Sequence, residues 1–109
     1  MTTKPVVPRR VALRDIDEAV AYYLVEVGDE AALRFIEAVE KTFARIGRHP
    51  ASGSPRYVVE LNLPGLRVVP VIRCPHLVFY VDRSSHIDVW RVLHGERDLP
   101  SGISSPDNL

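Results

Sequence analysis

Residues 87–98 read IDVWRVLHGERD, and the architecture of the whole chain can be worked out from this stretch. The segment from Ile87 to Leu93 is dense in β-branched and aromatic side chains, which suit the half-buried surface of a sheet. His94 and the polar residues after it predict a turn at the exit of this strand. A strand here needs neighbouring strands to pair with, and the sequence upstream offers candidates.

Two more strands precede this one. Residues 66–72 predict a strand, and Pro70 within it predicts an edge position or a bulge, because proline has no N–H to donate to a ladder. Residues 77–81, LVFYV, are apolar on both faces, which indicates a central strand. Phe79 and Trp90 are expected in the core. These three strands follow one another closely and predict a mainly antiparallel sheet.

The first half of the chain has the apolar periodicity of helices. One pattern runs from Pro8, placed in the first helical turn, to about Val27. A second runs from Asp29, expected as its N-cap, to Gly47, expected to close it. Gly28 is predicted to end the first helix in a left-handed conformation. So short a connection makes the two helices antiparallel.

The predicted element order is β-α-α-β-β-β, with residues 5–7 as a short first strand. The simplest packing of this order is an α+β fold in which a helical hairpin covers one face of a small, mainly antiparallel sheet. We interpret residues 1–99 as one domain. The segment 100–109, which is rich in serine and proline, is expected to be a flexible tail.

Composition narrows the class of protein. Fourteen basic and fourteen acidic side chains give a formal net charge of zero, so no bulk charge points to nucleic acid or to a membrane surface. The single cysteine, Cys74, excludes an internal disulfide and fits a reducing cytosol. We interpret it as a strand-end residue rather than a nucleophile. No apolar run is long enough for a membrane span or a signal peptide, so we expect a cytoplasmic protein.

Three local motifs resemble the RelE/ParE superfamily of small bacterial toxins. They are PGLR at 64–67, HLVFY at 76–80 and the stretch 87–98, the last being the most specific. The resemblance covers roughly residues 5–99 and is strongest to the ParE branch. It implies the RelE/ParE-like fold, in agreement with the element order above.

The resemblance also implies a function. A ParE-like protein is the toxin of a type II toxin–antitoxin system that inhibits DNA gyrase and thereby replication. It implies a ParD-like antitoxin that neutralises the toxin in a hetero-oligomer, and contact with operator DNA only through that antitoxin. No cofactor, metal or catalytic activity is expected, because the chain shows no recognisable nucleotide-binding, metal-ligand or triad motif.

Five residues are our candidates for contacting the gyrase target or the antitoxin: Arg67, Tyr80, Arg91, His94 and Arg97. They lie on or just after the predicted strands. The arginines can pair with carboxylates in two-pronged geometry, and a tyrosine hydroxyl needs a polar exit. The antitoxin is expected across the helical hairpin and along an edge of the sheet.

Two other readings remain open. A RelE-like, ribosome-dependent mRNA endonuclease would use Arg67, Arg73 and His94, with His94 as the acid or base. This catalytic inventory is thin, because both lysines precede the β region, no tyrosine follows Tyr80, and arginine is a poor base. A third reading is a non-toxic member that serves only in repression of its own operator.

Overall fold

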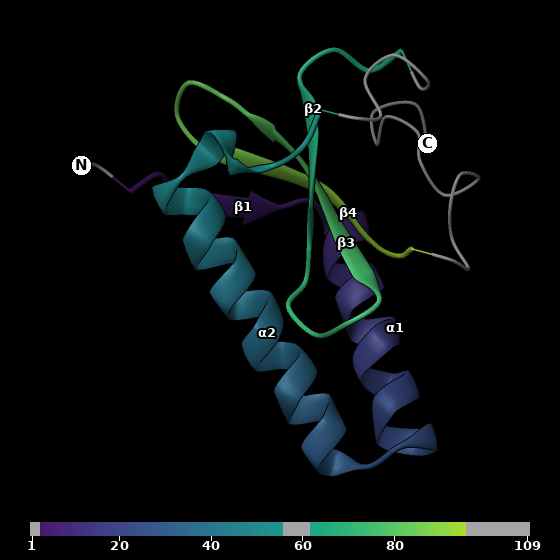
Figure 1. The fold of residues 1–109 in the computed structure, drawn as a ribbon. Coiled ribbons are helices and arrows are strands. Elements are labelled where there is room, and N and C mark those ends of the chain that lie inside the picture. Colours follow the sequence, from purple (N-terminus) through teal and green to yellow (C-terminus); the bar gives the residue numbers. More distant parts are fainter. Residues whose placement is uncertain (1–2, 56–61, 96–109) are drawn as a thin grey trace.

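A computed structural model describes residues 3–55 and 62–95 of the chain (Figure 1). Two helices lie together on one side of a four-stranded sheet. The sheet order is β1-β4-β3-β2, with β1 parallel to β4 and the other pairs antiparallel. The predicted α+β order is confirmed. The elements are β1 (Val6–Pro8), α1 (Arg10–Glu26), α2 (Asp29–Arg48), the 3₁₀ turn η1 (Pro50–Ser52), β2 (Leu66–Pro70), β3 (His76–Asp82) and β4 (Ile87–His94).

The sheet buries apolar side chains on both faces. On the helix side, Phe35, Val39 and Ile46 of α2 pack with strand residues that include Val78 and Val89. Alternate strand positions form a second cluster on the opposite face. It contains Leu66, Val68, Phe79, Val81, Trp90 and Leu93. The predictions that β3 is central and that Phe79 and Trp90 belong to the core are confirmed.

Strand β2 lies at one edge of the sheet, as Pro70 predicted, although it is shorter than expected. It ends at Pro70 because a tight turn begins there: the Val71 N–H donates to the carbonyl of His76, and Cys74 N–H donates to that of Val71. Residues 71–72 therefore belong to the β2–β3 turn rather than to the strand.

The predicted start of the first helix was wrong. Pro8 is the last residue of β1, and α1 begins at Arg10. β1 is an edge strand bonded to β4 alone, so the missing N–H of Pro8 leaves no ladder bond unmade. The chain returns to β4 one residue later, where Arg9 N–H donates to the carbonyl of Val89.

The junction of the two helices also differs from the prediction. Gly28, rather than Asp29, is the N-cap of α2, and Asp29 makes no capping bond from its side chain. Gly28 has φ +140° and ψ 170°, which is positive φ but not the left-handed helical conformation. Only glycine adopts this region readily. Its N–H donates to the carbonyl of Tyr23, which closes α1.

Gly47 does not end α2, which continues to Arg48. It is needed there for a close approach of the chain: a Cβ at this position would lie 2.8 Å from the carbonyl oxygen of Lys4. The Lys4 N–H donates to the Gly47 carbonyl, and the Lys4 ammonium pairs with Asp82 at 2.7 Å. Gly47 thus allows the segment before β1 to lie against the end of α2.

We expect Gly47→Ala to lower the free energy of unfolding by about 1–2 kcal/mol, because overpacking outweighs the roughly 1 kcal/mol gain in helix propensity. Denaturant unfolding followed by circular dichroism measures this change. Ala44→Gly, at an exposed position of the same helix, calibrates the propensity effect. A Gly47→Ala protein as stable as the parent or more so would show that the close approach is not a constraint.

One carboxylate joins three segments on the sheet face away from the helices. Asp88 accepts hydrogen bonds from Arg9 at 2.9 and 3.0 Å, from Arg83 at 3.2 and 3.1 Å, and from the Trp90 indole at 3.1 Å. Burial raises the pKa of the Asp88 carboxyl, but the hydrogen bonds from Arg9, Trp90 and Arg83 outweigh it and hold this pKa below its usual value.

This lowered pKa predicts an acid-sensitive contribution to stability. The unfolded chain, with an ordinary Asp pKa of about 3.9, takes up the proton first as the pH falls. The stabilisation by Asp88 is therefore complete well above that value and is lost as the pH falls through the lower, folded-state pKa. We expect Asp88→Asn to cost about 2 kcal/mol at pH 7 and progressively less below pH ~4.

Urea unfolding of both proteins between pH 7 and pH 2.5 measures this difference. Asp17→Asn, at an exposed site on α1, is the matched control and should change stability by less than about 0.5 kcal/mol. A stability difference between Asp88→Asn and the parent that stays constant down to the lowest pH would contradict the assignment.

Candidate functional site

Arg91 is engaged inside the protein. Its guanidinium binds the Asp15 carboxylate of α1 through two hydrogen bonds of 2.8 Å, and the Val92 N–H donates to the same carboxylate at 3.0 Å. Both side chains are largely buried, at 17 % exposure for Arg91 and 9 % for Asp15. The charge of Arg91 is therefore taken up in docking α1 onto β4, and its role in contacting a partner stays a prediction.

Tyr80 is also an internal residue. Its side chain is fully buried, and its hydroxyl donates to the carbonyl of Pro50 at 2.7 Å and accepts from the Gly53 N–H at 2.9 Å. The polar exit that a tyrosine requires is therefore the backbone of η1, not solvent. Tyr80 therefore has an internal role in this structure, and a contact between its side chain and a partner stays a prediction.

Arg67 holds the same segment from the neighbouring strand. It is paired with Tyr80 in the ladder, and its guanidinium donates to the Gly53 carbonyl at 2.7 Å and to that of Ala51 at 3.3 Å. Unlike Tyr80 it remains partly exposed. Arg67 therefore has a structural role, and one side of its guanidinium is committed to the segment 51–53.

We expect Tyr80→Phe to destabilise the protein by about 1–3 kcal/mol, because the buried Gly53 N–H and the partly buried Pro50 carbonyl lose their partner. Amide hydrogen exchange should rise in the segment 50–55. Phe43→Leu, in the helix layer, is a control that alters packing without removing a polar contact. Unchanged amide hydrogen exchange at Gly53 in the Tyr80→Phe protein would show that the Tyr80 hydroxyl does not hold the segment 50–55 in place.

The nuclease candidates are not gathered in one place. His94 is opposite His76 in the β3–β4 ladder, and their rings meet edge to face with centroids 5.4 Å apart. Arg67 is opposite Tyr80, four residues further along β3, which is about 13 Å at the usual strand rise. Arg73 lies in the β2–β3 turn, near the His94 end, at φ 60°. Arg67 is thus separated from the other two.

Cys74, interpreted from the sequence as a strand-end residue rather than a nucleophile, lies in the turn between β2 and β3. It is half-buried, and this burial raises the pKa of its thiol, which makes the thiolate scarcer. Arg97, our fifth candidate contact, and the predicted tail 100–109 lie outside the residues that the structure describes.

Both edges of the sheet restrict the addition of another strand. On the outer side of β2, Ser54 forms a β-bridge with Val68, with backbone hydrogen bonds of 2.8 and 2.9 Å. Pro70, two residues on, has no N–H. On the other edge, Pro8 in the three-residue strand β1 also has none. An incoming strand would find few donors to pair with.

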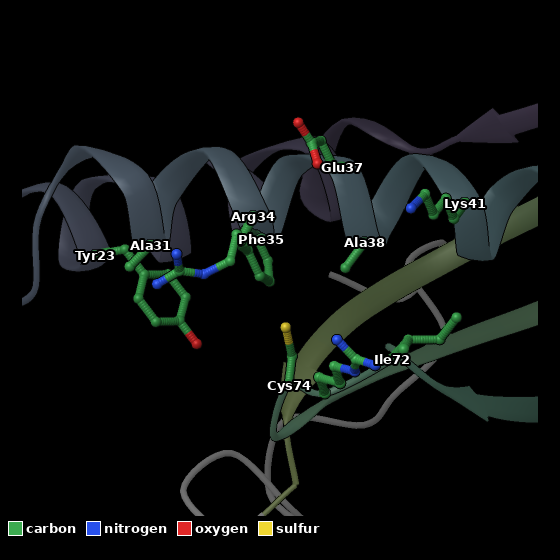
Figure 2. Close-up of a pocket in the computed structure, with 10 residues that line it drawn as sticks. Tyr23, Ala31, Arg34, Phe35, Glu37, Ala38, Lys41, Ile72 and Cys74 are labelled. Carbon is green, nitrogen blue, oxygen red and sulfur yellow. The ribbon is translucent and has the colours of Figure 1, made fainter.

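A cavity of about 660 Å³ opens between α2 and the β2–β3 turn (Figure 2). Its apolar lining comes from Ala31, Phe35 and Ala38 on α2 with Tyr23 of α1. Ile72, Arg73 and Cys74 line it from the turn. Arg34, Glu37 and Lys41 complete the lining from α2. Its size is that of a small-ligand or side-chain pocket.

This cavity was not predicted from the sequence. Arg34 and Lys41 lie on the polar side of an amphipathic helix, where charged residues usually face solvent. The position of the β2–β3 turn beside α2 makes them part of the lining of the cavity, although both side chains remain exposed. Their spacing of seven residues, two helical turns, was the one available sign that they share a face.

The helical hairpin exposes apolar side chains around its tip. Val25 is 80 % exposed and Val27 61 %, and Leu24 and Leu33 are also exposed. The helical hairpin, across which the antitoxin is expected to bind, therefore carries exposed apolar side chains. Isolated exposed apolar residues are common, but their concentration at one end of a small domain is typical of an interaction surface.

The described residues contain neither a metal-ligand cluster nor a membrane-spanning helix. In residues 3–55 and 62–95, no three His, Cys, Asp or Glu side chains are grouped as a metal ion requires. Neither of the helices in this part of the chain is long and apolar enough to cross a membrane.

Comparison with known proteins agrees with the geometry. The sequence model of one protein family, described as the ParE toxin of the type II toxin–antitoxin system parDE, matches residues 6–99 of this chain. A solved structure described as the chromosomal ParDE TA system from P. aeruginosa has the same fold, with a TM-score of 0.73 and 21 % identity, over 86 % of this chain and 98 % of that one. No curated protein sequence matches. The chain belongs to the family of ParE toxins of type II toxin–antitoxin systems.

Proposed function

We propose that this ParE toxin inhibits DNA gyrase by binding to it, without catalysis of its own, and that a ParD-type antitoxin neutralises it. The observation that carries the proposal is the separation of Arg67 from Arg73 and His94 along the sheet. General acid–base cleavage of RNA needs its groups within hydrogen-bond reach of one phosphate. A protein whose candidate groups lie this far apart is better suited to act as a binding surface.

The internal role of the arginines supports the same proposal. Arg91 is bound to Asp15, and Arg67 is bound to the carbonyls of residues 51 and 53. Arg91 cannot turn to a phosphate without giving up Asp15, and Arg67 has only the uncommitted side of its guanidinium to offer one. Of the predicted contacts, His94 at the end of β4 and Arg97 beyond it remain proposed contacts for gyrase.

The antitoxin is proposed to cover the apolar surface of the hairpin. Val25, Val27 and Leu33 are exposed there, and burial of apolar area is the main driving force of most associations. The limited edges of the sheet favour docking on side chains over the addition of a full strand.

The test is a gyrase supercoiling and cleavage-complex assay with the purified toxin. We expect inhibition by the toxin alone and relief when the ParD-type antitoxin is added in equal amount. Arg97→Ala should weaken inhibition by about tenfold if it removes one charge-assisted contact, whereas Arg14→Ala, on the exposed face of α1, should not.

The same preparation can decide against the proposal. A folded toxin that binds its antitoxin but leaves gyrase unaffected contradicts gyrase as the target. Cleavage of ribosome-bound mRNA that His94→Ala abolishes would instead establish the nuclease reading. Binding to the antitoxin with neither effect would indicate a role in operator repression alone.

A further inference from the structure

We propose that the cavity between α2 and the β2–β3 turn is an anchor site for the antitoxin, and that it takes an apolar side chain flanked by carboxylates. The inference rests on the proposed antitoxin partner and adds where that partner is held and by what chemistry. It concerns a different part of the surface from the tip of the hairpin.

The interior of the cavity suits an apolar side chain. Phe35, Ala38 and Ala31 present carbon surface from α2, and the small alanines leave the space that a larger side chain would occupy. Ile72 stands at the turn with 48 % of its surface exposed, which burial under a partner would remove from water. With a volume of about 660 Å³, the cavity has room for a large side chain and part of its backbone.

The charged lining favours an acidic partner. Arg34, Lys41 and Arg73 contribute three cations, against the single carboxylate of Glu37. Figure 2 shows the Glu37 carboxylate directed away from Ile72 and Cys74. Arg34 has an ion pair with Glu30, but the separation is 3.7 Å and both side chains are exposed, so this contact is weak. The chain as a whole has no net charge, so this excess of positive charge is local.

The neighbouring edge of the sheet indicates which kind of partner segment would occupy the cavity. A strand-forming segment finds few donors at β2, where Ser54 is already bridged to Val68. A partner that approaches this edge is therefore better held by side chains that enter the adjoining cavity. An acidic segment of the antitoxin meets both requirements, since it can place an apolar side chain between α2 and the turn and its carboxylates opposite Arg34 and Lys41.

The experiment measures binding of the purified ParD-type antitoxin to the full-length toxin by biolayer interferometry. The test variant reverses two charges, Arg34→Glu with Lys41→Glu. The matched control, Arg10→Glu with Arg14→Glu, reverses two exposed charges on α1. A third variant, Ala38→Leu, fills the cavity without a change of charge. Thermal unfolding establishes that each variant is folded.

We expect the test variant to bind at least about tenfold more weakly than the parent near 0.1 M salt, and the control to change by less than about threefold. The loss should shrink towards 0.5 M salt, because screening weakens charge pairs at a surface. Ala38→Leu should also weaken binding, with little dependence on salt.

Other results would overturn the inference. Parent-like binding by both cavity variants would reject the anchor site and leave the gyrase proposal intact. Equal losses in the test and control variants would show a general effect of charge. Self-association of the parent that only the cavity variants abolish, with antitoxin binding unchanged, would assign the cavity to a second copy of the chain. An antitoxin that fails to bind the folded parent would reject the anchor site together with the antitoxin part of the proposed function, whereas gyrase inhibition is tested separately.

Discussion

The bidentate ion pair between Asp15 and Arg91 fixes the position of the helical hairpin on the sheet. Asp15 also accepts the Val92 N–H, so one carboxylate locks both the register and the distance of α1 against β4. Replacing such a pair by apolar residues is often tolerated, but removing one partner leaves a buried charge. The pair therefore specifies geometry more than it adds stability. Since α2 follows α1 through a single tight junction, the cavity beside α2 inherits its shape from this contact.

Most of the arginines near the sheet stabilise the fold through hydrogen bonds to other parts of the chain. Arg9 and Arg83 converge on Asp88, Arg91 binds Asp15, and Arg67 supports the backbone of η1. These contacts join segments that are far apart in the sequence and that apolar packing alone would leave free to slide. The basic residues on α2 have no comparable role in the fold. Arginines that hold the fold together and basic residues that stay exposed on α2 therefore have separate roles in this chain.

The sequence was a good guide to the elements and a poor one to individual side chains. Apolar periodicity and Gly28 predicted the order of the elements, and Pro70 predicted the edge position of β2. These signals could be used because each of them is local in the sequence. The role of Pro8 was predicted wrongly because it depends on the pairing of β1 with β4. The role of Gly47 was predicted wrongly because it depends on the contact of the Lys4 segment with α2. Tyr80 and Arg91 looked like contact residues, since nothing local reveals that η1 and Asp15 would take their polar groups.

The pairing of β1 with β4 also has a consequence for how the protein comes into being. The first strand lies parallel to the last, and Arg9 meets Asp88 across 79 positions of the sequence. Contacts this distant close a long loop and form late in folding. During synthesis, the segment before α1 must wait until β4 has left the ribosome. The complete sheet therefore exists only after β4 has been made, so a translation product truncated before β4 lacks the complete sheet.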